Sequence, residues 1–454
     1  MQKITHFLVG ALLVTSSLFS QEGSPAIQPP VSVPPAESLV ISPAQTPNPT
    51  PPAVVPRLAQ GDVQFSEKKD PDANDMEALR RWIRDKRLVT VKEIGGDLAL
   101  SGEVRTELQD TNEVKNGIQQ RGSGGAINKP QYAWDIEVNI MIDYRTDRTW
   151  AAIKIEFDED MGIRSGTVNK VRLEKGYLGG RIVPGDTFTL DGELGRRYLF
   201  NVFDSKIEIS SLYDGVLFRF NKAWMAIGDY YFNIGALLVD DKTNHYAYVV
   251  ETGGLRIANT GLNLKYSIID WYKPYANEFN NLRYKFLVSQ FLVNYQFYPA
   301  WIGKRLIKFY GAGLCNHLAS GVPQTHNRRQ NYAWYAGLSV GLVKKQYDWA
   351  IDANYQWAQA QTVPEFDVSG IGRGNAAGVG FYTNNIDGDP GSGATTSTTA
   401  VGGCNYKGFE VEALYAFTDN LTLLQNFKYS NTLNKNIGPN IRYKQYELEF
   451  IYAF

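Results

Sequence analysis

The chemistry that this sequence could perform rests on charged side chains and not on a catalytic motif. The 454 residues include four histidines, and no HExxH, GxSxG or CxxC motif occurs. His245, His317 and His326 lie near predicted strand ends or loops, which favours exposed loop residues over metal ligands. The glycine-rich run 370–374 and the acidic turn 387–389 lack the surroundings of a phosphate or calcium loop. We therefore expect no enzymatic reaction, no cofactor and no metal.

Charged residues recur instead on one face of predicted strands. In residues 132–144 every second residue is apolar, namely Tyr132, Trp134, Ile136, Val138, Ile140, Ile142 and Tyr144. The residues between them are Ala133, Asp135, Glu137, Asn139, Met141 and Asp143. Because a strand sends successive side chains to opposite faces, one face of this strand is apolar and the other is mostly polar.

These alternating segments are long. A strand that crosses a bilayer needs about 9–11 residues, whereas a strand of a soluble protein usually has about 5–6. In several segments aromatic residues flank an aliphatic middle, as in a lipid-facing band between two aromatic girdles. A lipid-facing sheet must close, because lipid offers no partner for an open edge. The pattern predicts an all-β protein, a closed antiparallel transmembrane β-barrel of about 16 strands, with 14 to 18 as the range.

Two of the sixteen predicted strands have weak patterns. Residues 169–182 alternate poorly, and the predicted strand 204–220 contains Asp214-Gly215, which is also a turn signal. The connections alternate between short and long, and the longest is 360–404. Short periplasmic turns and long external loops are typical of outer-membrane barrels, and an even strand number places both termini in the periplasm.

Alternation assigns a set of charged side chains to the barrel interior. The predicted pore-lining charges are Glu103, Arg105, Glu107, Asp135, Glu137, Asp143, Lys154, Glu156, Asp191, Glu193, Lys265, Asp348, Asp352, Glu410, Glu412, Lys428, Glu447 and Glu449. A second cluster, predicted at a constriction, is Arg196, Arg197, Asp204, Lys206 and Glu208. Two alternatives stay open: the charges pair and fill a closed interior, or those of the second cluster are solvated loop residues.

The end of the sequence carries the most specific signal. Tyr446, Leu448, Phe450, Tyr452 and Phe454 are every second residue, and Phe454 is the last. This pattern resembles the C-terminal strand by which outer-membrane proteins are recognised by the barrel-assembly machinery. We expect this strand to pair with the first strand, because pairing removes both sheet edges.

The N-terminal part divides into three segments before the predicted barrel at 96–454. Residues 1–20 have the Lys3 n-region and apolar h-region of a signal peptide. Residues 21–60 are proline-rich and predict a disordered, extended periplasmic spacer. Residues 61–95 are charged and predict one short periplasmic helix, with an apolar stripe up to about Lys86. Cys315 and Cys404 could then form a disulfide in an oxidising compartment, remain free thiols, or pair between molecules.

Composition excludes other classes of function. The formal net charge of −1 offers no basic patch for nucleic acid, and no apolar run of 18 residues follows the N-terminal segment. Residues 96–454 resemble Gram-negative outer-membrane porins as an architectural class. The order of signal, proline-rich spacer, charged helix and barrel is also similar to porin-type proteins of chlamydia-related bacteria.

The resemblance implies a bacterial outer-membrane porin, a water-filled channel for passive diffusion of ions and small hydrophilic solutes. Its partners would be outer-membrane lipid, the assembly machinery and, as one alternative, two further copies in a homotrimer. Two other functions stay open: an adhesin or structural barrel, because of the Gly/Ser/Thr-rich segment 360–404, and a barrel hydrolase. A hydrolase would need a Ser/His or Asp/His cluster at one strand end.

Overall fold

The computed structural model describes residues 89–454, except 94–95, 127–129, 163–169, 186–187, 199–202, 209–211, 225–226, 241–244, 273–277, 280–281, 284–285, 320, 323–324, 365–366, 368–369 and 372–403. The predicted signal peptide, proline-rich spacer and short helix up to Lys86 lie outside the described residues. Within the described part, helices are too short or too polar to cross a membrane.

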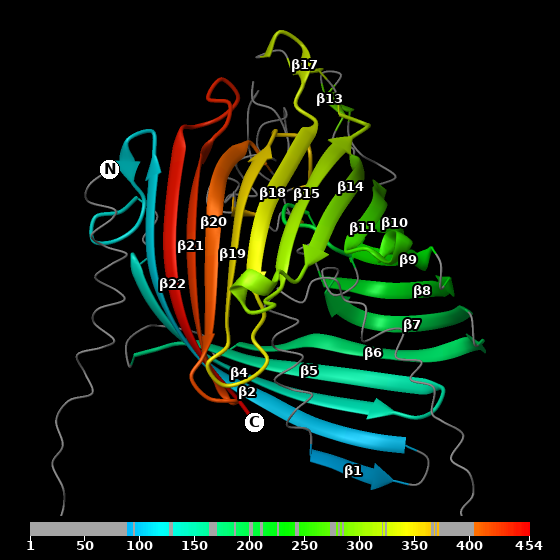
Figure 1. Ribbon diagram of the computed structural model, residues 1–454. Helices are drawn as coiled ribbons and strands as arrows, with labels where there is room; N and C mark the ends of the chain where they lie inside the picture. The colour runs from blue at the N-terminus through cyan, green and yellow to red at the C-terminus, as the bar shows by residue number, and fades with distance from the viewer. Residues whose placement is uncertain are drawn as a thin grey trace, which may run out of the picture. The chain divides into compact units, whose positions relative to one another are not determined.

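Sixteen strands form the wall of the barrel (Figure 1). They are β2 (Gly96–Lys115), β4 (Tyr132–Arg145), β5 (Thr149–Asp160), β6 (Lys170–Pro184), β7 (Phe188–Tyr198), β8 (Leu212–Trp224), β9 (Gly228–Asp240), β10 (His245–Leu255), β11 (Leu262–Tyr272), β14 (Phe286–Phe297), β15 (Ile307–Asn316), β18 (Tyr332–Gly341), β19 (Trp349–Ala358), β20 (Tyr406–Ala416), β21 (Leu421–Thr432) and β22 (Ile441–Ala453).

The barrel closes because β2 pairs with both its neighbours. Each wall strand is antiparallel to the next one along the chain, and β2 also pairs with β22. Glu107 of β2, for example, lies opposite Asp135 of β4 on one side and Glu449 of β22 on the other. The structure therefore confirms a closed antiparallel barrel of sixteen strands.

Shorter elements add to this wall. β1 (Val89–Glu93) pairs with the first residues of β2 and was not predicted. β3 (Ile118–Gln119) pairs with the end of β2. The remaining elements lie in connections: β12 (Glu278–Phe279) with β13 (Leu282–Arg283), β16 (Gly321–Val322) with β17 (Arg328–Arg329), and the short helices η2 (Ile257–Asn259) and η3 (Ala300–Ile302).

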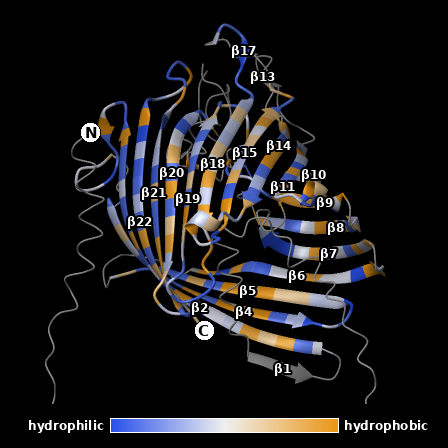
Figure 2. Cartoon of the chain, in the orientation of Figure 1, coloured by the Kyte–Doolittle hydropathy of each residue, from blue (hydrophilic) through white to orange (hydrophobic). Residues whose placement is uncertain are grey.

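The two faces of the wall differ in chemistry, and Figure 2 shows hydrophobic and hydrophilic residues alternating along the strands. Outward side chains are large, apolar and exposed, and they include Trp134, Ile136, Ile153, Phe157, Val216, Phe218, Phe232, Ile234, Tyr248, Tyr266, Phe291, Phe309, Leu338, Ile351, Val411 and Phe450. An exposed apolar surface of this extent marks contact with lipid or with another protein.

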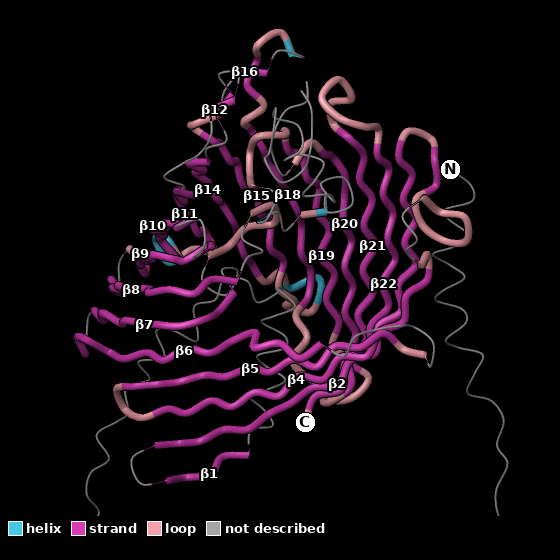
Figure 3. Tube along the Cα trace, turned by 180° about the vertical axis from the view of Figure 1, so that it is seen from behind, coloured by secondary structure: helices cyan, strands magenta, loops and turns pink. Residues whose placement is uncertain are grey.

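The two ends of the barrel also differ. At one end the strands are joined by short connections such as 146–148 and 417–420, and at the other by long connections such as 317–331 and 359–405. In Figure 3 the loops rise from the end that carries β12 and β16. We call these the short-turn end and the long-loop end.

Two strands depart from the sequence prediction. β6 contains two register shifts, near Lys154/Ile155 of its partner β5 and between its own Arg181 and Val183, which explains why its residues alternate poorly. β8 begins at Leu212 and not at residue 204, and Asp214-Gly215 lies inside this strand instead of forming a turn. The residues preceding β8 therefore belong to a connection, and six of them form the candidate site.

Candidate pore constriction

The connection between β7 and β8 contributes a segment to the barrel interior. Of its residues the structure describes Phe203–Glu208, which we call the inner segment. Phe203, Ile207 and Glu208 are buried, whereas Asp204, Ser205 and Lys206 are partly exposed. Such burial is not expected of a solvated loop, and it results from contacts with the inner wall.

Polar contacts fix the beginning of the inner segment. The Lys265 amino group lies 3.0 Å from the Asp204 carboxylate, and the Gln290 side-chain amide donates to the Asp204 carbonyl oxygen at 2.7 Å. Lys265 is on β11 and Gln290 on β14, so both contacts come from the inner face of that side of the barrel. The Ser205 hydroxyl accepts from the backbone N–H of Glu208 at 3.1 Å and stabilises the turn within the segment.

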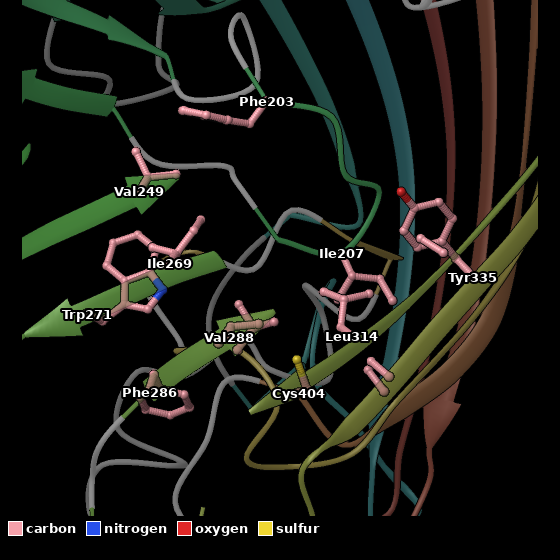
Figure 4. Close-up of a cluster of buried hydrophobic side chains, with 14 of the residues drawn as sticks. Phe203, Ile207, Val249, Ile269, Trp271, Phe286, Val288, Leu314, Tyr335 and Cys404 are labelled. Carbon is pink, nitrogen blue, oxygen red and sulfur yellow. The ribbon is translucent and has the colours of Figure 1, made fainter. Parts of the chain in front are cut away.

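Apolar contacts fix the same segment against an apolar sector of the inner wall. Phe203 and Ile207 belong to one buried cluster with inward residues of β8–β11, β14, β15 and β18–β20. In Figure 4, Ile207, Leu314 and Cys404 lie close together, while Phe203 lies nearer to Val249. Burial of a large apolar side chain contributes about 1.5–3 kcal/mol. The two anchors therefore hold the segment inside the barrel.

Part of the connection between β19 and β20 also lies inside the barrel, next to the inner segment. The Ile371 N–H donates to the Gln356 side chain at 3.1 Å, and the Ser430 hydroxyl donates to the Ile371 carbonyl oxygen at 3.0 Å. A Cβ at Gly370 would lie 2.1 Å from the Tyr406 hydroxyl and 3.1 Å from the Lys206 carbonyl oxygen. Only glycine allows this close approach, so the glycine-rich run 370–374 begins with a residue that packs inside the barrel.

Lys206 points from the inner segment toward an acidic part of the wall. Its amino group lies 3.5 Å from the Asp352 carboxylate and 5.8 Å from the centre of the Tyr310 ring. Burial lowers the pKa of Lys206, but the charge of Asp352 and the further charges of Glu410 and Glu412 together raise it well above its ordinary value. Lys206 is therefore a fixed positive charge, and about a third of its side chain (36%) is exposed.

Asp352, Glu410 and Glu412 form this acidic part of the wall. Asp352 of β19 lies opposite Glu412 of β20 in the strand register. Asp352 also accepts a hydrogen bond from the Tyr310 hydroxyl at 2.7 Å, and Glu410 accepts from the Asn426 side chain at 3.1 Å. These bonds hold the carboxylates along the wall that Lys206 faces. Lys206 and these carboxylates therefore place charges of both signs next to one another on the inner surface of the barrel.

The remaining inner charges form a paired network with more carboxylates than bases. Arg105 contacts three carboxylates, those of Glu103, Glu137 and Glu449. Further ion pairs join neighbouring strands: Lys154 with Glu174, Arg172 with Glu156 and Asp158, Arg181 with Asp191, Arg219 with Glu193, and Lys428 with Glu410 and Glu447. Within β7, Arg197 also contacts Glu193. Pairing across strands stiffens the wall and reduces its local field.

The structure divides the predicted site residues into three groups. Arg197 and the inner-wall residues Asp135, Glu137, Lys154, Glu156, Asp352, Glu410 and Glu412 lie on the inner face of strands, and Asp204, Lys206 and Glu208 on the inner segment. Two predictions need correction. Arg196 faces outward and makes a two-bonded ion pair with Asp214 at 2.8 and 2.7 Å, because adjacent strand residues face opposite ways. Asp348 precedes β19 and accepts from the N–H groups of Lys344 and Lys345, so it caps a turn.

Several inner basic residues escaped the sequence analysis. Arg172 and Arg181 lie on β6, where the register shifts hide the alternation. Arg219 of β8 contacts Glu193, and Lys308 of β15 lies 5.3 Å from the centre of the Tyr310 ring. One sequence signal could have shown that a segment covers the inner face of this wall. β14 begins Phe-Leu-Val-Ser-Gln-Phe-Leu-Val and is largely apolar on both faces. A strand whose inner face meets open water has no reason to be apolar there.

Glu208 is buried where the two folded-in connections meet. Burial raises the pKa of Glu208 well above its ordinary value, and the charge of nearby Asp367 raises it further, while a hydrogen bond with Trp271 opposes the shift. Both carboxyl groups belong to fully buried residues. A neutral Glu208 thus fits the contact between these connections, whereas an ionised one would add a second charge beside Asp367.

The two cysteines are free thiols, not a disulfide. Cys315 faces outward on β15, between the inward residues Leu314 and Asn316. Cys404 is fully buried inside the barrel, in the apolar cluster with Leu314 and Ile207. The wall therefore separates the two sulfur atoms. Burial also raises the pKa of Cys404 well above its ordinary value, so this thiol is unreactive.

The C-terminal residues Tyr446, Leu448, Phe450, Tyr452 and Phe454 all face outward on β22 and directly after it. Phe454 exchanges two backbone hydrogen bonds with Gly102 of β2, each 2.9 Å long. Its ring lies over Gly102, where a Cβ would come within 2.5 Å of the ring. The last strand therefore completes the seam of the barrel with both its backbone and its side chain.

One Ser–His contact bears on the hydrolase alternative. The Ser289 hydroxyl and His317 Nε2 lie 2.7 Å apart on the exposed outer side of the long-loop end. A nucleophilic serine also needs its histidine to be oriented by a third group. Among the described residues, the ion pairs and hydrogen bonds give His317 no carboxylate partner. The described residues also contain no group of three His, Cys, Asp or Glu side chains placed to hold a metal ion.

The sequence matches no protein-family model and no curated protein. Among solved structures, it is similar to OprB of Pseudomonas putida, at 9% identity and a TM-score of 0.47, covering 79% of this chain and 94% of that one. It is also similar to OmpF of Salmonella typhi in complex with daunomycin, at 13% identity and a TM-score of 0.45, covering 81% and 100%. A triple mutant of the Rhodopseudomonas blastica porin matches at 8% identity and a TM-score of 0.39, covering 79% and 100%.

Proposed function

We propose that this chain is a passive porin of a bacterial outer membrane, with a water-filled channel for ions and small hydrophilic solutes. The observation that carries the proposal is the inner segment, which sets Lys206 against the acidic wall of Asp352, Glu410 and Glu412 inside a charge-lined barrel. The exposed apolar outer face suits contact with lipid. No chemical step is required, because width and charge at the constriction determine which solutes pass.

The proposed orientation follows from the two ends of the barrel. The long-loop end faces the outside and the short-turn end faces the periplasm, so that both termini are periplasmic. Phe454 and the outward aromatic residues before it would then be the signal read by the assembly machinery. The exposed outer face also has room for contact with further copies, and a homotrimer is the oligomer that we propose.

Solute uptake by proteoliposomes tests this function. We expect swelling in sugars, at a rate that falls as the sugar grows. The double variant Phe203→Ser/Ile207→Ser removes both apolar anchors of the inner segment, and it should speed the swelling and admit larger sugars. Leu318→Ser, a control, replaces an apolar residue with serine on an exposed loop and should leave swelling unchanged. If neither the folded wild-type barrel nor the folded double variant allows any sugar to enter the proteoliposomes, the protein is not a diffusion channel.

Two other functions have specific support. The apolar cluster and the folded-in connections favour a barrel with a filled interior, which would suit an adhesin or structural protein. The Ser289–His317 contact supplies two of the three groups that a serine hydrolase at the outer surface would need. A fluorophosphonate probe separates them, because it labels a nucleophilic serine and leaves both a porin and an adhesin unlabelled.

A further inference from the structure

Strands β20 and β22 sort their charged side chains by face. Their four carboxylates, those of Glu410, Glu412, Glu447 and Glu449, lie on the inner face. Their bases all lie on the outer face, where they are exposed: Lys407, Arg442 and Lys444. The pore does not explain these three cations, because the wall separates them from it.

The three cations lie close together near the long-loop end. Lys407 and Arg442 occupy the same row of the sheet, with Asn431 of β21 between them. Strands are about 4.8 Å apart, so the two backbones are about 10 Å apart. Lys444 is two residues further along β22, about 7 Å from Arg442. Figure 1 shows β20, β21 and β22 side by side. Long basic side chains from these positions can converge on one anionic group.

Aromatic side chains lie directly beside the cations on the same outer face. Lys407 is followed by the exposed Phe409 two residues along β20, and Lys444 lies opposite Tyr429 of β21. The Lys444 amino group is 5.8 Å from the centre of the Tyr429 ring. Aromatic rings at the end of an apolar wall mark the depth of lipid headgroups. The cations therefore lie at the level where the polar part of a lipid begins.

The charge of this patch is not cancelled in the described part of the wall. The ion pairs found there involve none of the three cations, and on the outer face of β20–β22 no carboxylate accompanies them. Asp110 of β2, opposite Tyr446, is the acidic residue at the border. Elsewhere on the outer face Arg196 is neutralised by Asp214. An unneutralised cationic triad at headgroup depth has the complementary charge for a phosphate.

We propose that Lys407, Arg442 and Lys444 bind the phosphate of a lipid headgroup in the leaflet at the long-loop end. The inference rests on the proposed insertion in a membrane, and it does not depend on conduction. Arginine offers paired donors to phosphate oxygens and lysine a mobile point charge. Each cation near an anionic lipid contributes about a fivefold gain in affinity, so the three together contribute about a hundredfold.

Binding of lipid A by the full-length barrel in zwitterionic detergent, followed by native mass spectrometry, tests the proposal. The triple variant Lys407→Gln/Arg442→Gln/Lys444→Gln should bind lipid A about a hundredfold more weakly. The matched control, Arg328→Gln/Arg329→Gln/Lys435→Gln, removes three exposed loop cations from the same end and should bind almost as wild type does. The charge-keeping variant Lys407→Arg/Arg442→Lys/Lys444→Arg should retain most of the affinity and guards against a folding defect.

Three results would overturn the proposal. Equal losses of lipid A affinity in the triple variant and in its loop control would show only a long-range attraction between the net charge of the protein and the lipid. Competition by inorganic phosphate at the same concentration as lipid A would indicate a site for soluble anions. Loss of oligomers without loss of lipid affinity would make this face a contact between copies. Planar-bilayer current is measured separately, so a silent barrel that binds lipid A would contradict the porin and not this inference.

Discussion

Lys206 is the residue whose change should alter ion preference most. It lies 3.5 Å from Asp352 and carries the positive charge of the inner segment against an acidic wall. Lys206→Gln removes this charge and keeps most of the side-chain length. The carboxylates of Asp352, Glu410 and Glu412 then act on passing ions without an opposing lysine. We expect a pore that already prefers cations mildly, because its inner face carries more carboxylates than bases, to prefer them more strongly.

The size of the effect follows from the distance between the charge and the ion. At about 7 Å in water, one unit charge acts on a monovalent ion with about 0.6 kcal/mol, close to RT. Removing it raises the concentration of K⁺ in the constriction about threefold and lowers that of Cl⁻ by a similar factor. The permeability ratio of K⁺ to Cl⁻ should therefore rise by up to about sevenfold at low salt.

Reversal potentials in KCl gradients measure this ratio. The effect should fade with salt, because the Debye length falls from about 30 Å at 0.01 M to about 3 Å at 1 M. Lys345→Gln removes an exposed lysine from a turn at the short-turn end and should leave the ratio unchanged. An unchanged ratio in Lys206→Gln at low salt would refute the constriction. Anion preference of the wild type would mean that the arginines of the inner wall outweigh its carboxylates.

Four further predictions concern orientation, closure, pH and thiol chemistry. Protease added to intact cells should cut within 360–404 and spare 25–56, and the opposite pattern would reverse the orientation. Phe454→Asp should lose the heat-modifiable folded band on gels, because the seam with β2 loses its ring; normal folding would show that β22 closes without it. Because the pKa of Glu208 is raised, the stability that it confers is complete below about pH 4.5 and is lost as the pH rises through the raised pKa; the thermal midpoint of Glu208→Gln should depend less on pH, and an unchanged pH profile would count against this role. Maleimide should label Cys404 only after denaturation, and rapid labelling of Cys404 itself in the native barrel, distinguished from the outward-facing Cys315 by peptide mass spectrometry, would contradict its burial.

Alternation of residue types was enough to predict the wall. In β4 the apolar residues from Tyr132 to Tyr144 occupy every second position, and the strand has the bounds that this pattern requires. The same rule, applied to β7, would have placed Arg197 on the inner face and Arg196 on the outer face. Asp191 and Glu193 were already predicted to face inward, and Arg197 follows them at an even spacing. The physical reason is that a pleated strand leaves no choice of face once one residue is placed.

The inner segment shows where this rule fails. Asp204, Lys206 and Glu208 alternate with Ser205 and Ile207, so they fit a strand pattern equally well. An extended segment that contacts apolar residues with one face and charged groups with the other also alternates with a period of two residues, although it does not join the sheet. β6 fails in the opposite way, because register shifts break the pattern in a true strand. Local sequence does not report these long-range contacts.

Single-channel recording in planar bilayers tests the central claim most directly. Purified full-length protein, shown to be folded by its heat-modifiable mobility, should produce stepwise ohmic currents in KCl, and the step size should change in the Phe203→Ser/Ile207→Ser variant. The folded barrel should also carry current in the absence of any added ligand. Insertion of folded barrel without current, in both the wild type and that variant, would contradict a porin and favour a barrel whose interior is filled.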